Sequence, residues 1–110
     1  MVMKLINAKE LKQRLDAGES IKLICALAHA SFEATRIPGS LNCLVKEDVE
    51  KLLDKEDEIV VYCSDVACNN SIRMYHLLDS LGYKKVTRFS GGLLEWESQG
   101  FPLVGSKVNH

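Results

Sequence analysis

The sequence lacks the features that mark nucleic-acid-binding, secreted and membrane proteins. Basic residues are not in excess, since 14 Lys and Arg face 15 Asp and Glu, and no basic run stands out. No apolar run approaches the roughly 18 residues of a membrane span. The N-terminal segment MVMKLINAKELK has no apolar core long enough for a signal peptide. We therefore expect a cytoplasmic protein with neither nucleic-acid nor membrane partners.

The sequence also lacks linkers, internal repeats and low-complexity segments. Its 110 residues are 46% hydrophobic and 26% charged, which is an ordinary globular composition. A chain of this length buries a core without help from metals or disulfides. We therefore predict one domain that spans residues 1–110.

Cysteines are few, but two of the four lie close together. The four are Cys25, Cys43, Cys63 and Cys68. In the cytoplasm thiols stay reduced unless they are catalytic or redox-sensing. A zinc site built on the latter pair and His76 lacks a fourth ligand, so neither a metal nor a cofactor is expected. Cys25 and Cys43 are most simply explained as core or partly buried thiols.

The hydrophobic pattern alternates between strand-like and helical segments. Strands are predicted at 4–6, 21–25, 58–62 and 86–89, with a short extended piece from Leu41. Helices are predicted after Asn7, at 30–35, at 46–53, from about Ser71 to the stop at Gly82, and after Gly91-Gly92. This alternation predicts an α/β fold with a central parallel sheet and helices on both faces. Ligand sites in such sheets lie beyond the carboxyl ends of the strands, where Cys63 falls.

The segment VVYCSDVACNNSIRMYHLL, residues 60–78, joins the most strand-like run to a helix. A thiol must ionise to act as a nucleophile, and backbone N–H groups and the positive end of a helix favour the ionised form. Small and polar residues after Cys63 can curl into an amide nest that holds a persulfide or another anion. The residues of this predicted loop are Ser64, Asp65, Val66, Ala67, Asn69, Asn70 and Ser71. The alternative is a buried structural cysteine at a strand end.

From Asn7 to Leu103 the chain resembles the rhodanese-like domains. The resemblance rests on AKELKQRLDAGE, the strand LIC, IPGSLN at 37–42, VVYC at 60–63, LGY at 81–83, FSGGLLEW at 89–96 and GFP at 100–102. It implies an α/β fold with a central parallel sheet. It also implies that the cysteine after the fourth strand, here Cys63, carries sulfane sulfur as a persulfide between a donor such as thiosulfate and a thiophilic acceptor.

The loop departs from the common pattern of this family. Cys68 stands where an arginine is usual, and the loop is about two residues longer. The cysteine-x4-cysteine-x2-serine spacing resembles a longer-loop subgroup with a second thiol. The loop contains no Lys or Arg, and its Asp65 opposes both thiolate formation and anion approach if it points inward.

Cys68 has three interpretations. In the first, it resolves a persulfide or sulfenate on Cys63 through a transient disulfide. In the second, it is itself the nucleophile, with Arg73 at the family spacing. In the third, it is a loop thiol with a packing role. A cysteine-x5-arginine phosphatase is excluded, because the required positions hold Asn69 and Met74 and provide no bidentate phosphate clamp.

Three functions stay open at the level of sequence. The first is a sulfurtransferase or sulfur carrier with Cys63 as the persulfide carrier. Its partners are a small sulfur donor (thiosulfate, polysulfide or persulfide) and a thiol acceptor. The second is a catalytically silent rhodanese-fold module that binds a partner protein, favoured by the absence of loop cations. The third is a redox switch in which Cys63 and Cys68 pair.

Overall fold

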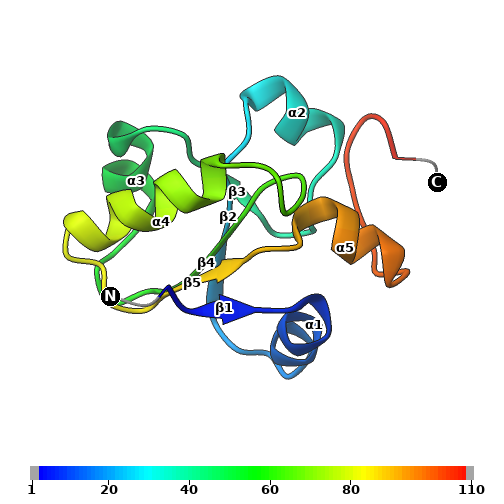
Figure 1. The fold of residues 1–110 in the computed structure, drawn as a ribbon, viewed down its shortest axis with the longest axis horizontal. Coiled ribbons are helices and arrows are strands. Elements are labelled where there is room, and N and C mark those ends of the chain that lie inside the picture. Colours follow the sequence, from blue (N-terminus) through cyan, green and yellow to red (C-terminus); the bar gives the residue numbers. More distant parts are fainter. Residues whose placement is uncertain (1–2, 109–110) are drawn as a thin grey trace.

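A computed structural model describes residues 3–108 of the chain. In chain order the elements are β1 (Leu5–Ile6), α1 (Ala8–Asp16), β2 (Ile21–Cys25), α2 (His29–Ala34), β3 (Leu41–Asn42), α3 (Lys46–Leu52), β4 (Glu58–Tyr62), α4 (Asn70–Ser80), β5 (Val86–Phe89) and α5 (Gly92–Ser98). The strands form one sheet in the order β1-β5-β4-β2-β3, and every neighbouring pair is parallel. Figure 1 shows the sheet at the centre with the helices around it.

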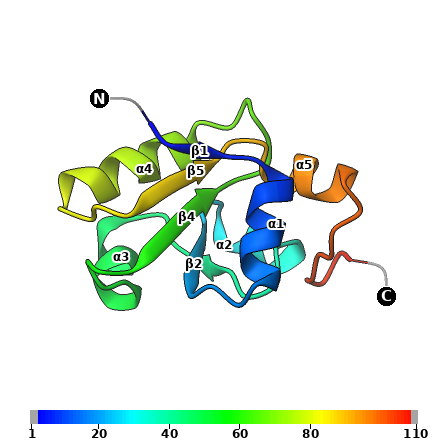
Figure 2. The ribbon, with the colours of Figure 1, turned by 90° about the horizontal axis from the view of Figure 1, so that it is seen from below.

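Helices cover both faces of the sheet, as the sequence predicted. In Figure 2 the strands run between α3 and α4 on the left and α1 and α5 on the right. Side chains of β4 alternate between the two layers: Ile59 and Val61 join the core cluster on the α3–α4 side, while Val60 and Tyr62 join the cluster on the α1–α5 side. A strand buried on both faces must be apolar throughout, which explains the EIVVY pattern.

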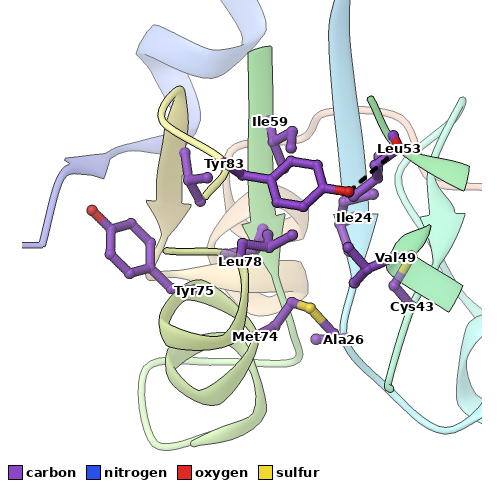
Figure 3. Close-up of a cluster of buried hydrophobic side chains, with 12 residues drawn as sticks. Ile24, Ala26, Cys43, Val49, Leu53, Ile59, Met74, Tyr75, Leu78 and Tyr83 are labelled. Atoms are coloured by element: carbon purple, nitrogen blue, oxygen red, sulfur yellow. Dashed lines mark hydrogen bonds between the residues drawn. The ribbon is translucent and has the colours of Figure 1, made fainter. Parts of the chain in front are cut away.

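The core on the α3–α4 side is built from aliphatic residues of the sheet and from two helices that contribute one apolar face each. Figure 3 shows Val49 of α3 and Leu78 of α4 converging on Ile24 and Ile59 of the sheet. Tyr83 closes this layer, and its hydroxyl donates a hydrogen bond to the carbonyl oxygen of Leu53 at 3.4 Å. The tail signature FSGGLLEW closes the other layer, where Trp96 of α5 packs with Phe89 of β5.

The predicted elements are confirmed with small shifts at their ends. His29 begins α2, although the sequence placed this helix from residue 30. Residue 70 begins α4, one position before the predicted start, and its N-cap Asn69 makes no capping hydrogen bond through its side chain. None of the helices described between residues 3 and 108 is long and apolar enough to cross a membrane.

Candidate active site at the carboxyl end of β4

Cys63 lies directly after β4, at the carboxyl edge of the sheet. Its side chain is buried, with 1% of the residue exposed. The Sγ atom lies 3.3 Å from Oγ of Ser71 in the first turn of α4 and 3.5 Å from the carbonyl oxygen of Cys68. The loop therefore folds back over the strand end, so that a thiol, a hydroxyl and the start of a helix meet at one point.

Asp65 is turned towards its own loop. Its Oδ1 accepts the backbone N–H of Ala67 at 2.9 Å, and its carbonyl oxygen accepts the N–H of Cys68 at 3.2 Å. These bonds form a tight turn of the Asx type, with Val66 exposed at its tip. The amides of Ala67 and Cys68 are engaged within the loop, so the predicted nest has fewer free N–H groups than the sequence suggested.

The remaining amides divide between the two sulfur atoms. The backbone N–H groups of Asn70 and Ser64 favour the ionised form of Cys68 and lower its pKa, and the N–H of Ser71 has the same effect on the pKa of Cys63. The sulfur of Cys63 also contacts Cys68, through the bond to its carbonyl oxygen at 3.5 Å. Both are free thiols. The structure thus brings Cys63, Cys68 and Ser71 together at the start of α4.

The two thiols ionise differently. Burial raises the pKa of Cys63, and the contact with Cys68 raises it further, which outweighs the stabilising Ser71 hydroxyl and N–H. Burial alone would raise the pKa of Cys68 too. However, the neighbouring Cys63 thiol and the N–H groups of Asn70 and Ser64 outweigh it, and the net pKa of Cys68 is lowered. In the resting pair the negative charge therefore favours Cys68.

Cys25 and Cys43 are core residues, as predicted. Both are fully buried. Burial raises the pKa of Cys25 to about 11 and that of Cys43 to about 12. A thiol that does not ionise near neutral pH is a poor nucleophile, so these two cysteines differ chemically from the pair in the loop.

The segment that begins with Gly92 of the FSGG signature binds the start of the loop through backbone hydrogen bonds. Leu93 and Leu94, in the first turn of α5, donate their N–H groups to the carbonyl oxygens of Cys63 and Ser64 at 3.0 and 2.9 Å. Gly92 has φ of +60°, and a Cβ atom there would overlap the carbonyl oxygen of Cys63. Glycine is therefore required both by the backbone conformation and by this close approach.

Arg88 of β5 was not among the site residues predicted from the sequence. This arginine is 7% exposed, and its Nε donates to Oγ of Ser71 at 2.9 Å. Its Nη2 is buried without a hydrogen-bond partner among the described residues. A single arginine in the apolar strand VTRF was the available signal, because a buried charge in a strand normally needs a reason. The loop itself has no cation, but the guanidinium of Arg88 lies next to its last residue, Ser71.

A small hollow adjoins the loop. It has a volume of about 170 Å³ and is lined by Ala26, Leu44, Asn70, Arg73 and Met74. Arg73 is exposed on the helix, as expected from its position beyond the helix cap. A larger hollow of about 420 Å³ lies between α5 and residues 100–108, and no residue of the Cys63 loop lines it. In residues 3–108 no group of three or more His, Cys, Asp or Glu is arranged to hold a metal.

Comparison with known proteins identifies the family. Residues 7–99 match the model of the rhodanese-like domain. The chain belongs to the rhodanese-like domain family. A rhodanese-like domain from the Anabaena protein Alr3790, solved by NMR, superposes with a TM-score of 0.83 at 23% identity, covering 96% of this chain and 82% of that one. At this identity the likeness supports the fold alone.

The sequence relatives carry names of two kinds. The HTH-type transcriptional regulator Rv0324 of Mycobacterium tuberculosis is 32% identical over 108 residues, covering 96% of this chain, which spans only 47% of that regulator's length. The putative sulfurtransferase YtwF of Bacillus subtilis is 29% identical over 104 residues, covering 93% of this chain and 98% of that protein. This relative, named a putative sulfurtransferase, thus aligns with nearly the whole of the chain.

Proposed function

We propose that this rhodanese-like domain transfers or carries sulfane sulfur as a persulfide on Cys63. The observation that carries the proposal is the position of Cys63 directly after β4. Its sulfur lies 3.3 Å from the hydroxyl oxygen of Ser71 at the start of α4, and the hydroxyl and the N–H of Ser71 both favour the ionised thiol. Both Ser71 groups can donate to an anionic sulfur, and the amide end of α4 favours negative charge there.

The transfer has two balanced steps. The Cys63 thiolate attacks the outer sulfur of thiosulfate, so that the new sulfur–sulfur bond of the persulfide forms, the old one breaks and sulfite leaves with its electron pair. An acceptor thiolate then attacks the outer persulfide sulfur, which moves to the acceptor, and the Cys63 thiolate leaves. A polysulfide or a small persulfide can replace thiosulfate as donor, with a shortened chain as the leaving group.

The surroundings of the loop favour anionic donors in spite of its missing cations. The carboxylate of Asp65 is held by the N–H of Ala67. Arg73 lines the adjoining hollow. We propose that a small sulfur anion approaches from this side, that the acceptor is a thiol, and that the protein works in the cytoplasm as one domain over residues 1–110.

Mass spectrometry of the intact cysteine peptides tests the proposal. After treatment with thiosulfate or polysulfide, we expect a gain of about 32 Da on the Cys63 peptide, as for one added sulfur. Cys63→Ser abolishes this gain, while buried Cys25 and Cys43 serve as internal controls. If the native protein gains no sulfur at Cys63, the domain is not a sulfur carrier and a silent binding module is the better explanation.

The contact between Cys63 and Cys68 favours a second candidate, a dithiol reaction. A Cys68 thiolate attacks the inner sulfur of a Cys63 persulfide, so that a Cys63–Cys68 disulfide forms and hydrosulfide leaves. The sulfane sulfur is reduced and the two thiols are oxidised. The lowered pKa of Cys68 supports this step. Cys68→Ser separates the candidates: the persulfide accumulates if Cys68 resolves it, and sulfur transfer to an added thiol is unchanged if Cys68 only accompanies it.

A further inference from the structure

Arg88 is a buried cation for which the described residues provide no anionic partner. Its side chain lies on the α3–α4 side of the sheet, because it follows Val86 of that layer by two positions along β5. In residues 3–108 no carboxylate lies within 4.0 Å of its guanidinium, and Nη2 has no hydrogen-bond partner. Burying a guanidinium without a counter-charge is unfavourable, so its retention in an apolar strand needs an explanation.

Among residues 3–108 the one side-chain partner of this guanidinium is Ser71, which connects it to Cys63. Nε of Arg88 lies 2.9 Å from Oγ of Ser71, and that oxygen lies 3.3 Å from Sγ of Cys63. Ser71 is itself 1% exposed, so water does not compete for its hydroxyl. The three side chains therefore form a continuous buried chain of hydrogen bonds that runs from β5 through α4 to the end of β4.

The chemistry of the three groups determines the direction of these bonds. A guanidinium only donates, whereas a hydroxyl has one proton and two acceptor lone pairs. Arg88 therefore always occupies one lone pair of Ser71. While Cys63 is a thiol, its S–H donates to the other lone pair; when its sulfur is anionic, the Ser71 proton turns towards that sulfur. The hydrogen bonds among the three side chains can form in both states of Cys63. Only the anionic state places a negative charge near the buried guanidinium.

We propose that Arg88 is a positioning residue that holds the Ser71 hydroxyl on the sulfur of Cys63 and favours the anionic thiolate or persulfide there. It supplies, from the neighbouring strand β5, the positive charge that the loop lacks. The inference deepens the proposed sulfur transfer and rests on an anionic Cys63 sulfur. The reactivity of the thiolate measures this anion without any sulfur being transferred.

The test is the pH dependence of Cys63 alkylation, followed on its peptide by mass spectrometry in a Cys68→Ser background that removes the second loop thiol. We expect Arg88→Met, which has a similar length but neither charge nor donor, to slow alkylation near neutral pH by roughly tenfold, equivalent to a midpoint about one pH unit higher. Lys84→Gln removes one positive charge from an exposed position outside the site and is the matched control. An unchanged midpoint in folded Arg88→Met overturns the proposal.

Two further variants establish that the effect passes through Ser71. Ser71→Ala should slow alkylation in the same direction, and adding Arg88→Met to it should change the rate less than twofold. If the full effect of Arg88→Met persists without the Ser71 hydroxyl, the positioning role is wrong. If Arg88→Met does not fold, Arg88→Gln provides an uncharged, polar replacement with the same expected loss.

The outcome is separable from that of sulfur transfer. A shifted alkylation midpoint together with no persulfide on Cys63 supports the role of Arg88 and contradicts the proposed function. A persulfide that forms equally in the parent and in Arg88→Met, with an unshifted midpoint, contradicts the role of Arg88 alone.

Discussion

The backbone N–H of Leu93 donates to the carbonyl oxygen of Cys63 at 3.0 Å, so the start of α5 holds the residue that ends the central strand. Gly92 makes this contact possible, because its φ is +60° and a Cβ atom there would overlap the same carbonyl. The position of the candidate nucleophile thus depends on a glycine that lies far from it in the chain.

Gly92→Ala should therefore destabilise the protein and displace Cys63. Strain at positive φ and the overlap with the Cys63 carbonyl together should lower the free energy of unfolding by about 2 kcal/mol or more. Gly39→Ala is the matched control, because Gly39 has φ of +84° but nothing within 4 Å of its Cβ position. Urea unfolding measures both variants, and equal losses would show that the contact with Cys63 contributes nothing.

Tyr62→Phe should destabilise the fold without changing the sheet. The Tyr62 hydroxyl accepts the N–H of Ile37 at 3.1 Å and lies 2.6 Å from Oγ of Ser40, in a fully buried site. Its loss leaves the Ile37 N–H without a partner, which costs about 1–3 kcal/mol. Tyr83→Phe, which loses only a bond of 3.4 Å to a carbonyl, should cost less in the same urea titration. The reverse order would contradict this account.

Cys63→Ala should raise the pKa of Cys68. The variant removes the neighbouring thiol that lowers the pKa of Cys68, while the N–H groups of Asn70 and Ser64 remain. The rate of Cys68 alkylation near neutral pH should fall, by about tenfold for each unit of increase. Cys43→Ala, which alters a buried thiol of the core, is the control and should leave the rate unchanged. A faster reaction of Cys68 in Cys63→Ala would overturn the assignment.

Alkaline pH should destabilise the protein through its two core thiols. Unfolded thiols lose protons from about pH 8.5, whereas Cys25 and Cys43, with pKa values of about 11 and about 12, keep theirs when folded. The unfolded state then binds fewer protons. The stabilisation is therefore complete below about pH 8.5 and is lost as pH rises towards the folded pKa values.

The expected slope is as much as about 1.4 kcal/mol per pH unit for each thiol. Urea unfolding between pH 8.5 and 10 measures it. In the double variant Cys25→Ala/Cys43→Ala the slope should be shallower, whatever the variant's stability at neutral pH. An identical slope in parent and variant would mean that other groups are responsible.

Local sequence patterns were enough to predict the fold. The runs IKLIC and EIVVY are apolar and strand-like, and each is separated from the next by a segment with helical spacing. These patterns arise because the spacing of apolar residues over a few positions determines which face of a strand or helix can be buried. The boundaries shifted only by single positions, for example at His29, because helix ends depend on contacts beyond the helix itself.

The candidate site was predicted only in part. The sequence placed Cys63, Cys68 and Ser71 in one segment after a predicted strand, but it left open whether the two thiols meet. The inward or outward direction of Asp65 could not be predicted. In the structure the carboxylate accepts the N–H of Ala67, because the local conformation of the turn brings these two groups together.

The role of Arg88 could not be predicted from the sequence. Its place in the strand VTRF was a signal, but nothing in the sequence indicated its contact with Ser71. The parallel pairing of β4 with β5 and the packing of α4 on both bring its Nε to the Ser71 hydroxyl, from a position seventeen residues along the chain. Short-range patterns could identify the thiol and the element that carries it. The charge behind that thiol depends on long-range packing, because a buried ion is placed by the elements that surround it and not by its neighbours in sequence.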